Sequence, residues 1–414
     1  MQDYTWAFDR SFLVFLLIAF VSLTIASKLK SIIPMPLIYG ILFAIGFGTK
    51  ILPTDMLLSA NMIAVGTIAF NVLVVHSGTM IRIPMLIAKK KESLLCIAAS
   101  LILVVIVGFG LTPVIGKGLA FLAPGSVIGG GASCAIASRW VLDKNPAISV
   151  FPWLIFMFQG LFCVPIVTWA LKRESKALVQ DFRSQNPAAK GNTAAGQPPH
   201  PEAQASVRPA AGISAESAKK PICERIPAKY KNTAYYLGII MIVTVVNNLL
   251  HATVLSGLNI NPNITALLFG VILGSTGLMD KAPLFKSDSY GLLLMGLMGL
   301  MANTIARVPW QGLLSFLPPL IIVFVVSTIV LVLCGVIGAK ICHFRPEHGI
   351  ALTMNCMMGF PVNDMLIENA AKAGANDAEK GYIKSQIGPV LGIGTMLISN
   401  AVSVLIVSVM AIFV

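Results

Sequence analysis

The chain has 414 residues, of which 56% are hydrophobic and only 11% charged. A soluble protein of this size cannot bury so much apolar surface, because its outer face must still meet water. The net charge of +13 does not indicate nucleic-acid binding, since the basic residues lie in short loops and one linker, as membrane topology places them. The seven cysteines are scattered without a C-x-x-C pair, so neither a disulfide framework nor a zinc site is predicted.

The first half of the chain contains five apolar runs of a length suited to helices in a bilayer. Between the fourth and fifth runs, residues 119–140 are instead rich in glycine and small polar residues. We predict that this segment is a re-entrant hairpin or a broken helix. The five runs cover residues 11–27, 35–52, 58–79, 93–116 and 148–171.

Residues 172–231 break this pattern. The stretch is rich in alanine and proline, and it carries eleven Lys and Arg residues against five Asp and Glu residues. Such a composition predicts a disordered or loosely structured linker. The linker would separate an N-terminal transmembrane repeat, residues 1–171, from a C-terminal one, residues 232–414.

The second half repeats the scheme of the first. An interrupted polar segment, residues 346–371, again separates the fourth apolar run from the fifth. Short motifs also recur: the T-x-x-R motif that begins at Thr79 returns at Thr304, and Pro36 has its counterpart in Pro262. These matches favour a duplication. The five runs of this half cover residues 233–252, 260–279, 288–307, 312–341 and 386–414.

The distribution of Lys and Arg predicts the orientation in the membrane. If the N-terminus is outside, the basic loops and the linker all fall on the cytoplasmic side, and the C-terminus is again outside. An odd number of spans in each half forces the halves into opposite orientations. The predicted fold is therefore an all-α polytopic protein of the bacterial inner membrane, with two inverted five-helix repeats that each contain a hairpin or broken helix.

The two interrupted segments are the best candidates for a transport site, because irregular backbone is tolerated at membrane depth only where it is buried or lines a cavity. In the first segment, Gly129, Gly130 and Gly131 would let the backbone approach a substrate closely. Ser133 could add an oxygen for the substrate, and Ser126 one for an ion. The alternative is that these small residues only permit tight helix packing.

The second interrupted segment has its polar residues at the predicted break, which Gly359 and Pro361 create. Asn355, Asn363 and Asp364 cluster there and are predicted to contact the substrate. Asn363 and Asp364 are also candidate ion ligands. An acidic residue in a membrane segment is by default a functional candidate, although Asp364 could also act as a helix N-cap.

Two further candidates for ion binding lie one on the third helix of each half. Asn71 and Asn303 are polar residues within apolar runs, and either could approach the site. Each could equally be a hydrogen-bond partner between helices. We expect Asn363, Asp364 and the stretch from Gly129 to Ser133 to line one cavity near the bilayer midplane.

At these motifs the chain resembles bacterial sodium/glutamate symporters, among the elevator-type ion-coupled anion transporters. The resemblance covers nearly the whole chain in topology. It includes the I-P-x-P-x-x-x-G start of the second helix and both hairpins, which in those symporters read S-G-G-H-G-T and G-H-C-G-F-G-L-G-A-T-P-T-A-I-A-N. The matching positions are Ile33, Pro34, Pro36, Gly40, Gly129, Gly130, Ser133, Cys356, Gly359, Ile367 and Asn369.

The resemblance implies a homodimer, in which a scaffold holds a mobile region that carries both hairpins. It also implies Na⁺-driven symport of an acidic solute, with Na⁺ as the coupling ion and no other cofactor. Gly131 and Asn355 stand where the symporters have His, and Asn363 and Asp364 replace Thr-Pro. The solute could therefore be an amino acid, another carboxylate or a different small organic solute.

Other functions remain open from the sequence alone. A proton-coupled carrier or exporter would use Asp364 as its titrating group. A membrane-embedded enzyme is a remote alternative, because the chain offers no H-E-x-x-H, no G-x-S-x-G and no paired-Asp motif. We therefore predict a transporter rather than an enzyme.

Overall fold

A computed structural model describes residues 4–29, 33–81, 83–142, 144–185, 223, 226–255, 262–280, 282–358 and 362–414, and every regular element in these ranges is a helix. By length and composition, seven of the described helical segments can cross a membrane. Three shorter apolar helices accompany them, and each of these segments lies over one of the predicted apolar runs. The chain is an all-α, multi-pass membrane protein, as predicted.

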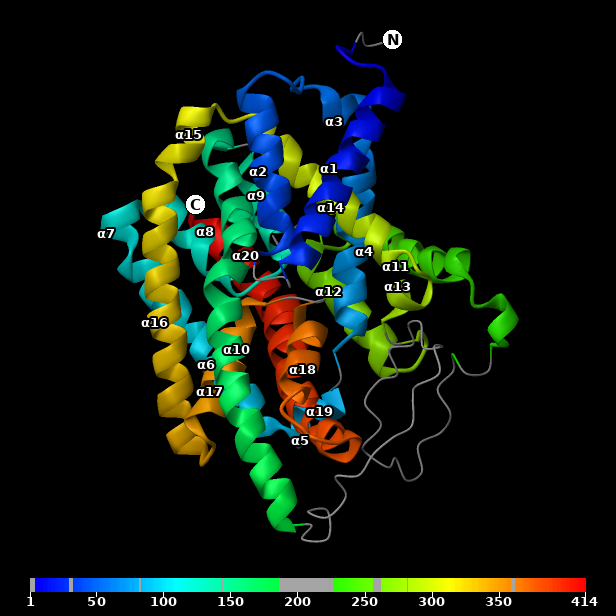
Figure 1. Cartoon of the computed structure of the whole chain (residues 1–414). Coiled ribbons are helices and arrows are strands. Elements are labelled where there is room, and N and C mark those ends of the chain that lie inside the picture. Colours follow the sequence, from blue (N-terminus) through cyan, green and yellow to red (C-terminus); the bar gives the residue numbers. More distant parts are fainter. Residues whose placement is uncertain are drawn as a thin grey trace.

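The first half of the chain begins with two helices that are joined by a short connection and ends with one very long helix (Figure 1). Its α-helices are α1 (Phe8–Lys28), α2 (Met35–Gly48), α3 (Met56–Ser59), α4 (Met62–Thr79), α5 (Ile83–Ala88), α6 (Lys90–Leu103), α7 (Thr112–Ile115), α8 (Lys117–Val127), α9 (Gly131–Leu142) and α10 (Phe151–Gln185). A π-helix, η1 (Val104–Gly110), continues α6, and a 3₁₀-helix, η2 (Pro146–Val150), leads into α10.

The second half contains α-helices in the same order. They are α11 (Thr233–Thr253), α12 (Pro262–Ser275), α13 (Pro283–Lys286), α14 (Tyr290–Ala306), α15 (Trp310–Ser315), α16 (Leu317–Cys342), α17 (Pro346–Met354), α18 (Val362–Ala371), α19 (Asp377–Ile393) and α20 (Ser403–Met410). The 3₁₀-helices η5 (Ala228–Tyr230), η6 (Asn355–Met357) and η8 (Ala411–Phe413) and the π-helix η7 (Gly394–Val402) complete this half. Several counterparts have equal lengths: α1 and α11 have 21 residues, and α2 and α12 have 14.

Residues at the helix starts explain where several elements begin. Pro34 and Pro36 flank the start of α2, where a fixed φ angle suits the first turn and no helical N–H is lost. The side chain of Asn232 accepts a hydrogen bond from the Tyr235 N–H and caps α11. Asn376 caps α19 in the same way by accepting from the Glu379 N–H, while the Glu379 carboxylate accepts from the Ala375 N–H.

The predicted linker begins later than its composition suggested. Helix α10 continues past residue 171 and ends at Gln185, so the prediction of loose structure is wrong for residues 172–185. The physical reason is tertiary, because charged residues of this extension pair with Arg345 and Glu379 of the second half. Residues 186–222 of the predicted linker lie outside the described residues.

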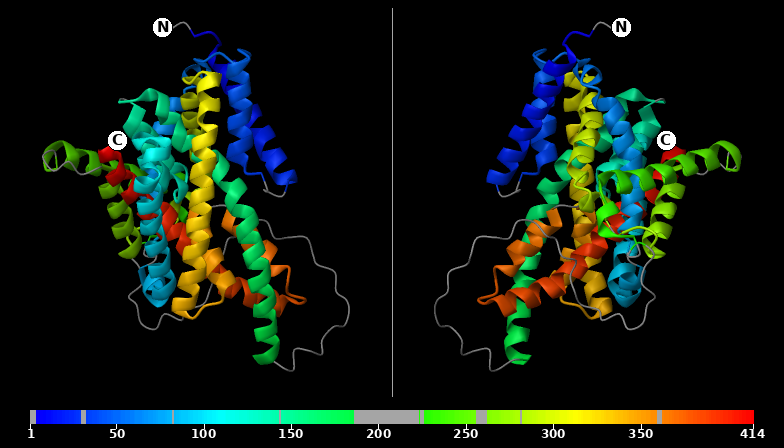
Figure 2. Two further views of the ribbon diagram at one scale, coloured as in Figure 1. Left: turned by 90° about the vertical axis from the view of Figure 1, so that its left-hand side faces the viewer. Right: turned by 90° about the vertical axis from the view of Figure 1, so that its right-hand side faces the viewer.

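Six helices form a continuous row. Along this row α1 packs on α2, α2 on α14, α14 on α4, α4 on α12 and α12 on α11. Figure 2 shows α1 and α2 at one edge of the molecule and α11 at the opposite edge. The row therefore joins the first three apolar helices of each half, which are α1, α2 and α4 in the first half and α11, α12 and α14 in the second. We call it the scaffold row.

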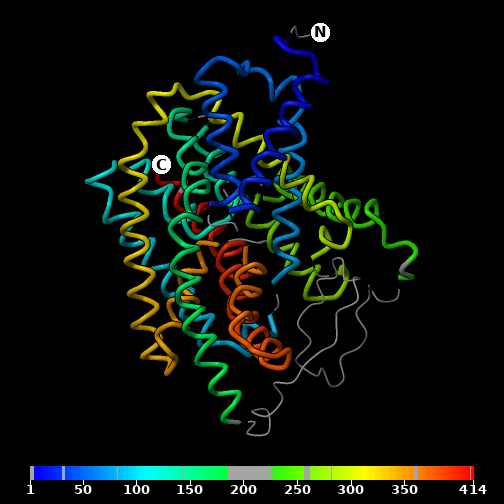
Figure 3. Tube along the Cα trace, in the orientation of Figure 1, coloured from blue at the N-terminus to red at the C-terminus, as the bar shows by residue number. Residues whose placement is uncertain are grey.

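The remaining long elements form a second group, the hairpin bundle, which consists of α6, α8–α10 and α16–α20 together with η1, η6 and η7. Within it α16 packs on α6 and α17, and α10 packs on α8, α9, α17 and α18. The tube view shows α10 running along much of the length of this bundle (Figure 3). Both interrupted segments belong to the hairpin bundle.

Close backbone contact between α4 and α12 holds the centre of the scaffold row. A Cβ atom at Gly270 would lie 2.2 Å from the Val75 carbonyl oxygen, and one at Gly78 would lie 2.4 Å from the Leu267 carbonyl oxygen. Gly270 and Gly274 are four residues apart and face the same stretch of α4. Small residues at this G-x-x-x-G spacing let the backbones of two membrane helices approach each other closely.

A buried carboxylate connects the start of α11 to the α12–α14 connection. Asp280 is 8% exposed and accepts hydrogen bonds from Lys231 at 2.8 Å, from Lys286 at 2.6 Å and from the Tyr236 hydroxyl at 3.0 Å. Burial raises the pKa of Asp280, but the hydrogen bonds from the two lysines outweigh burial and lower the pKa below its ordinary value. The ionised form is thus favoured in the folded protein.

The Asp280 cluster gives a prediction about pH. Because the folded-state pKa lies below the unfolded value of about 3.9, the stabilisation is complete above that value and is lost as pH falls through the folded-state pKa. We expect Asp280→Asn to lower the thermal midpoint at pH 7, and the difference from wild type to shrink as pH falls below about 4. Thermal unfolding of both proteins from pH 3 to pH 7 measures this. A constant difference across that range would contradict it.

Candidate functional site

The two interrupted segments enter the hairpin bundle from opposite ends of α10. At the first segment, Gly118 near the start of α8 lies against Ile148, just before α10 begins. At the second segment, Arg345 before α17 pairs with Asp181, and Glu379 after α18 pairs with Arg183, both near the end of α10. Each segment therefore has its outer ends beside one end of α10 and its break inside the bundle.

The break of the first segment consists of Ile128–Gly130 between α8 and α9. Two glycines here are closely packed: a Cβ atom at Gly129 would lie 2.5 Å from the Gly125 carbonyl oxygen of the preceding helix α8, and one at Gly131, the first residue of α9, would lie 2.8 Å from Leu297 Cδ2. Gly130 is less crowded, since its nearest neighbour, Ser399 Oγ, would lie 3.6 Å from such an atom. Packing accounts for Gly129 and Gly131, and Gly130 remains the glycine with room beside it.

The two predicted serines of the first segment already have partners. Ser126 is fully buried, and its hydroxyl donates to the Leu122 carbonyl oxygen of the preceding turn at 2.7 Å. The Ser133 hydroxyl lies 2.6 Å from that of Ser403 on α20. Ser403 in turn donates to the Ser399 carbonyl oxygen at 2.6 Å. Ser133 thereby joins the first hairpin to the last helix of the chain.

The second segment brings two asparagines together at one backbone oxygen. Asn355 donates its amide Nδ2 to the Leu391 carbonyl oxygen at 2.8 Å, and Asn363 donates to the same oxygen at 3.2 Å. Asn363 also donates to Thr395 Oγ1, which lies 3.4 Å from the Met358 carbonyl oxygen and donates to it. Of the three residues predicted to cluster at the break, Asn355 and Asn363 share this acceptor. Gly359 and Pro361, the predicted cause of the break, lie outside the described residues.

The amide oxygens of these asparagines carry the chemical character of the site. Asn355 is fully buried and Asn363 is 5% exposed, and among the described residues neither Oδ1 atom has a hydrogen-bond partner. Ser399 Oγ is likewise buried without a partner in the described part of the chain. Leaving such oxygens unsatisfied costs about 1–3 kcal/mol each. The site thus offers neutral oxygen atoms as acceptors.

Asp364 does not share this buried environment. Its side chain is exposed, whereas that of the adjacent Asn363 is buried. Successive residues of a helix point about 100° apart, so the helix that turns Asn363 inward turns Asp364 outward. The cavity near the bilayer midplane that Asn363, Asp364 and Gly129–Ser133 are expected to share stays a prediction.

The other two ion-site candidates belong to the scaffold row. Asn71 on α4 and Asn303 on α14 are half-buried in the scaffold row. Within the described residues, no hydrogen bond links either of them to Asn355, Asn363 or Leu391. Their predicted role in ion binding stays a prediction.

One helix connects the breaks of both hairpins. The π-helix η7 places Thr395 beside Met358 and Asn363 of the second hairpin and Ser399 beside Gly130 of the first, and α20, which follows it, places Ser403 beside Ser133. Sequence analysis missed these residues of the last helix. The spacing T-x-x-x-S-x-x-x-S puts all three hydroxyls on one helix face and would have been the signal. A π-helix within an α-helix is itself frequent at functional sites.

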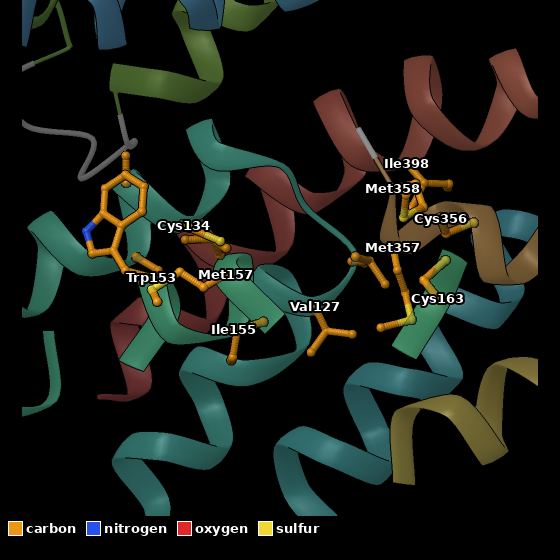
Figure 4. Packing of buried hydrophobic residues seen from close by; sticks show 14 of the residues in the cluster. Val127, Cys134, Trp153, Ile155, Met157, Cys163, Cys356, Met357, Met358 and Ile398 are labelled. Carbon is orange, nitrogen blue, oxygen red and sulfur yellow. The ribbon is translucent and has the colours of Figure 1, made fainter. Parts of the chain in front are cut away.

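Apolar and sulfur-containing side chains surround the breaks. Figure 4 shows Cys356, Met357 and Met358 of the second hairpin near Cys163 of α10 and Ile398 of η7. The Cys163 thiol lies 3.0 Å from the Met354 carbonyl oxygen and donates to it, so α10 also contacts the end of α17. These fully or almost fully buried side chains exclude water from the amide oxygens. Electrostatic interactions with a bound ion would be strong in such surroundings.

No protein-family model matches the chain, and no curated protein matches it.

Proposed function

We propose that the chain is a secondary active transporter that couples the movement of a small organic anion to Na⁺. The observation that carries this proposal is the pair of buried amide oxygens of Asn355 and Asn363, which have no hydrogen-bond partner among the described residues. Both amides are oriented by donation to the Leu391 carbonyl oxygen. Hard cations take oxygen ligands, and an ion between these oxygens would satisfy them.

The helix ends at the two breaks support separate positions for the ion and for the anion. Helix α17 ends at Met354, and the partial negative charge at the C-terminal end of a helix favours a cation. Helices α9 and α18 begin at Gly131 and Val362, where free N–H groups favour an anion. A carboxylate between the starts of α9 and α18 and a Na⁺ beside α17 would attract each other. This arrangement is the physical basis for coupling in our proposal.

The arrangement of helices supports an elevator mechanism built on inverted repeats. The recurring order and lengths of the helices agree with a duplication, and the two hairpins meet opposite ends of α10. We propose that the hairpin bundle moves and that the scaffold row stays fixed, as a homodimer in the bacterial inner membrane. Both termini would be outside and the linker cytoplasmic. The identity of the anion, an amino acid or another carboxylate, is left to experiment.

The test is a thermal-shift screen of the purified full chain. Small carboxylates are added one at a time in Na⁺ buffer or in choline buffer of equal ionic strength. We expect at least one carboxylate to raise the thermal midpoint in Na⁺ only, because a ligand that binds the folded state stabilises it. A carboxylate that stabilises equally in choline, or a screen without any stabilising carboxylate, would refute Na⁺-coupled binding.

Proton coupling is the second candidate, and it would use Asp364, an acidic residue of the second hairpin that is not buried in the protein. The two candidates separate in one experiment on liposomes. Flux that requires Na⁺ and does not change between pH 6 and pH 8 excludes Asp364 as the coupling group. Flux that follows a pH gradient without Na⁺ and disappears in Asp364→Asn would establish proton coupling.

A glycine next to the asparagine pair provides a separate prediction. A Cβ atom at Gly394 would lie 2.9 Å from Asn355 Nδ2, so Gly394→Ala should displace this amide from Leu391. We expect roughly tenfold weaker Na⁺-dependent stabilisation, about 1.4 kcal/mol of binding free energy. Gly392→Ala is the matched control, since its new methyl group meets the flexible ends of Met85 at 3.4 Å and Met396 at 4.0 Å. Equal effects of the two substitutions on Na⁺ titrations of the thermal midpoint would contradict this.

A further inference from the structure

The start of α9 is the accessible part of the first break. Gly130, Gly131 and Ala132 are partly exposed, whereas the residues on either side of them, 120–129 and 133–138, are buried. The first hydrogen bond of α9 runs from the Cys134 N–H to the Gly130 carbonyl oxygen. The N–H groups of the residues between these two therefore have no partner within the helix and present partial positive charge. This end of α9 favours an anion, and a ligand can reach it.

A buried hydroxyl of the last helix lies beside the same residues. Ser399 in η7 is 2% exposed, and its Oγ atom has no hydrogen-bond partner in the described part of the chain. This atom lies 3.6 Å from the position that a Cβ atom of Gly130 would take. Serine in a helix often donates to a carbonyl oxygen one turn earlier, as Ser403 does to Ser399 at 2.6 Å. The Ser399 hydroxyl makes no such bond, so it is available to a ligand at the start of α9.

The fold itself does not require glycine at position 130. Added Cβ atoms at Gly129 and Gly131 would meet neighbours at 2.4 Å and 2.8 Å, so packing explains both of those glycines. At Gly130 the corresponding distance of 3.6 Å is an ordinary van der Waals contact. Its backbone does not have the positive φ angle that would favour glycine either. The missing side chain leaves space between the start of α9 and the Ser399 hydroxyl.

The local charge selects an anion for this space. A hydroxyl can donate to an anion or bind a cation through its oxygen, so Ser399 alone does not decide between them. The partial positive charge at the start of α9 disfavours a cation. The buried amide oxygens that suit a cation lie one turn of η7 earlier, where Thr395 accepts a hydrogen bond from Asn363. The space beside Gly130 therefore suits a carboxylate, and the asparagine pair suits the ion.

We propose that Ser399 is a substrate-binding residue, whose hydroxyl donates to one oxygen of a carboxylate that the N–H groups at the start of α9 also bind. The inference rests on the proposed function for the kind of ligand, and it deepens that function by naming the side chain that recognises the carboxylate. Gly130 provides the space that the carboxylate occupies. Because Thr395 and Ser399 are four residues apart in one helix, the ion and the carboxylate are held about one turn from each other.

Thermal-shift titrations of the purified full chain test this assignment. The probes are acetate, succinate and L-alanine, which share a carboxylate group, each in Na⁺ buffer and in choline buffer of equal ionic strength. We expect at least one probe to raise the thermal midpoint of wild type. Ser399→Ala and Gly130→Ala should each weaken binding of that probe about tenfold or more. The first loses a hydrogen bond to a charged group, and the second fills the space with a methyl group that the fold tolerates.

The matched control is Ser408→Ala in α20. Ser408 is 3% exposed, and its Oγ atom is also buried without a partner among the described residues, but it lies nine residues further along the chain. This variant should bind the probe as wild type does. Without any carboxylate, Ser399→Ala should keep the wild-type response to Na⁺ and should be as stable as wild type or more stable, because it removes an unsatisfied hydroxyl. A serine with a purely structural role would not combine these results with weaker carboxylate binding.

The outcomes separate this inference from the proposed function. Wild type that responds to none of the probes, or full binding in both Ser399→Ala and Gly130→Ala, overturns the assignment of Ser399. Equal loss in Ser408→Ala, or loss of the Na⁺ response in Ser399→Ala, overturns it as well. If Ser399→Ala does not fold, Gly130→Ala decides. A probe that binds equally in choline but weakly to both variants supports Ser399 and refutes Na⁺ coupling.

Discussion

Asn363→Ala abolishes the Na⁺-dependent rise in thermal midpoint; this is the largest functional effect that we expect from a single substitution. The change removes one of the two buried amide oxygens together with the donor that binds Leu391 and Thr395. Loss of a ligand in a water-excluded site should weaken Na⁺ binding by about a hundredfold or more, or at least ~2.7 kcal/mol. Na⁺ titration of the thermal midpoint in purified protein measures this effect.

The control for Asn363→Ala lies on the same helix. Asn369 is half-buried and accepts a hydrogen bond from Lys372, away from the asparagine pair. Asn369→Ala and Asp364→Asn should both retain the Na⁺ response. If Asp364→Asn lost the response and Asn363→Ala kept it, the ion site would have to be placed on the exposed side of α18 instead.

Gly270→Leu prevents the close crossing of α4 and α12 and produces the largest loss of stability that we expect. The new side chain would start 2.2 Å from the Val75 carbonyl oxygen and 2.9 Å from Gly78 Cα. Both neighbours are backbone atoms, so the helices themselves must separate. Overpacking of this kind costs about 1–3 kcal/mol and sometimes more; with two backbone contacts we expect ~3 kcal/mol or more. Thermal unfolding and size-exclusion chromatography in detergent measure it.

The matched control is Gly291→Leu on α14, where no described residue outside its own helical turns lies within 4 Å of the added Cβ position. This substitution should be neutral or slightly stabilising, because leucine has the higher helix propensity. Equal stability of the two variants would mean that α4 and α12 do not cross as closely as described. Aggregation of the Gly270 variant alone would agree with the prediction.

Much of the architecture could be predicted from the sequence, because long apolar runs and glycine-rich interruptions are local signals. The breaks at Ile128–Gly130 and after Met358 fall inside the predicted segments 119–140 and 346–371. The end of α10 could not be predicted in this way. Its last turns are stabilised by pairs such as Arg183 with Glu379, whose partners lie almost 200 residues away in sequence.

The candidate site was predicted in part for a similar reason. Asn355 and Asn363 stand at an obvious break, so their residue types and position identify them. The orientation of Asp364 depends on which face of α18 packs against η7. Because Asn363 faces η7, the next residue, Asp364, points away from it. Thr395 and Ser399 lie in an apolar run, where hydroxyl residues are common. Only their contacts with helices that are distant in the sequence distinguish them from other Ser and Thr residues of such runs.

Helix α10 carries a proline near its middle, and this has a mechanical consequence. Pro165 has no N–H, so one rung of the hydrogen-bond ladder is missing between Ile148 and Asp181. The outer ends of the two hairpins contact α10 on opposite sides of Pro165, some 50 Å apart along the helix. A bend at Pro165 would move the outer end of one hairpin relative to that of the other without breaking any further backbone hydrogen bond. In the proposed transporter, such a bend would widen access from one face of the bilayer and narrow it from the other.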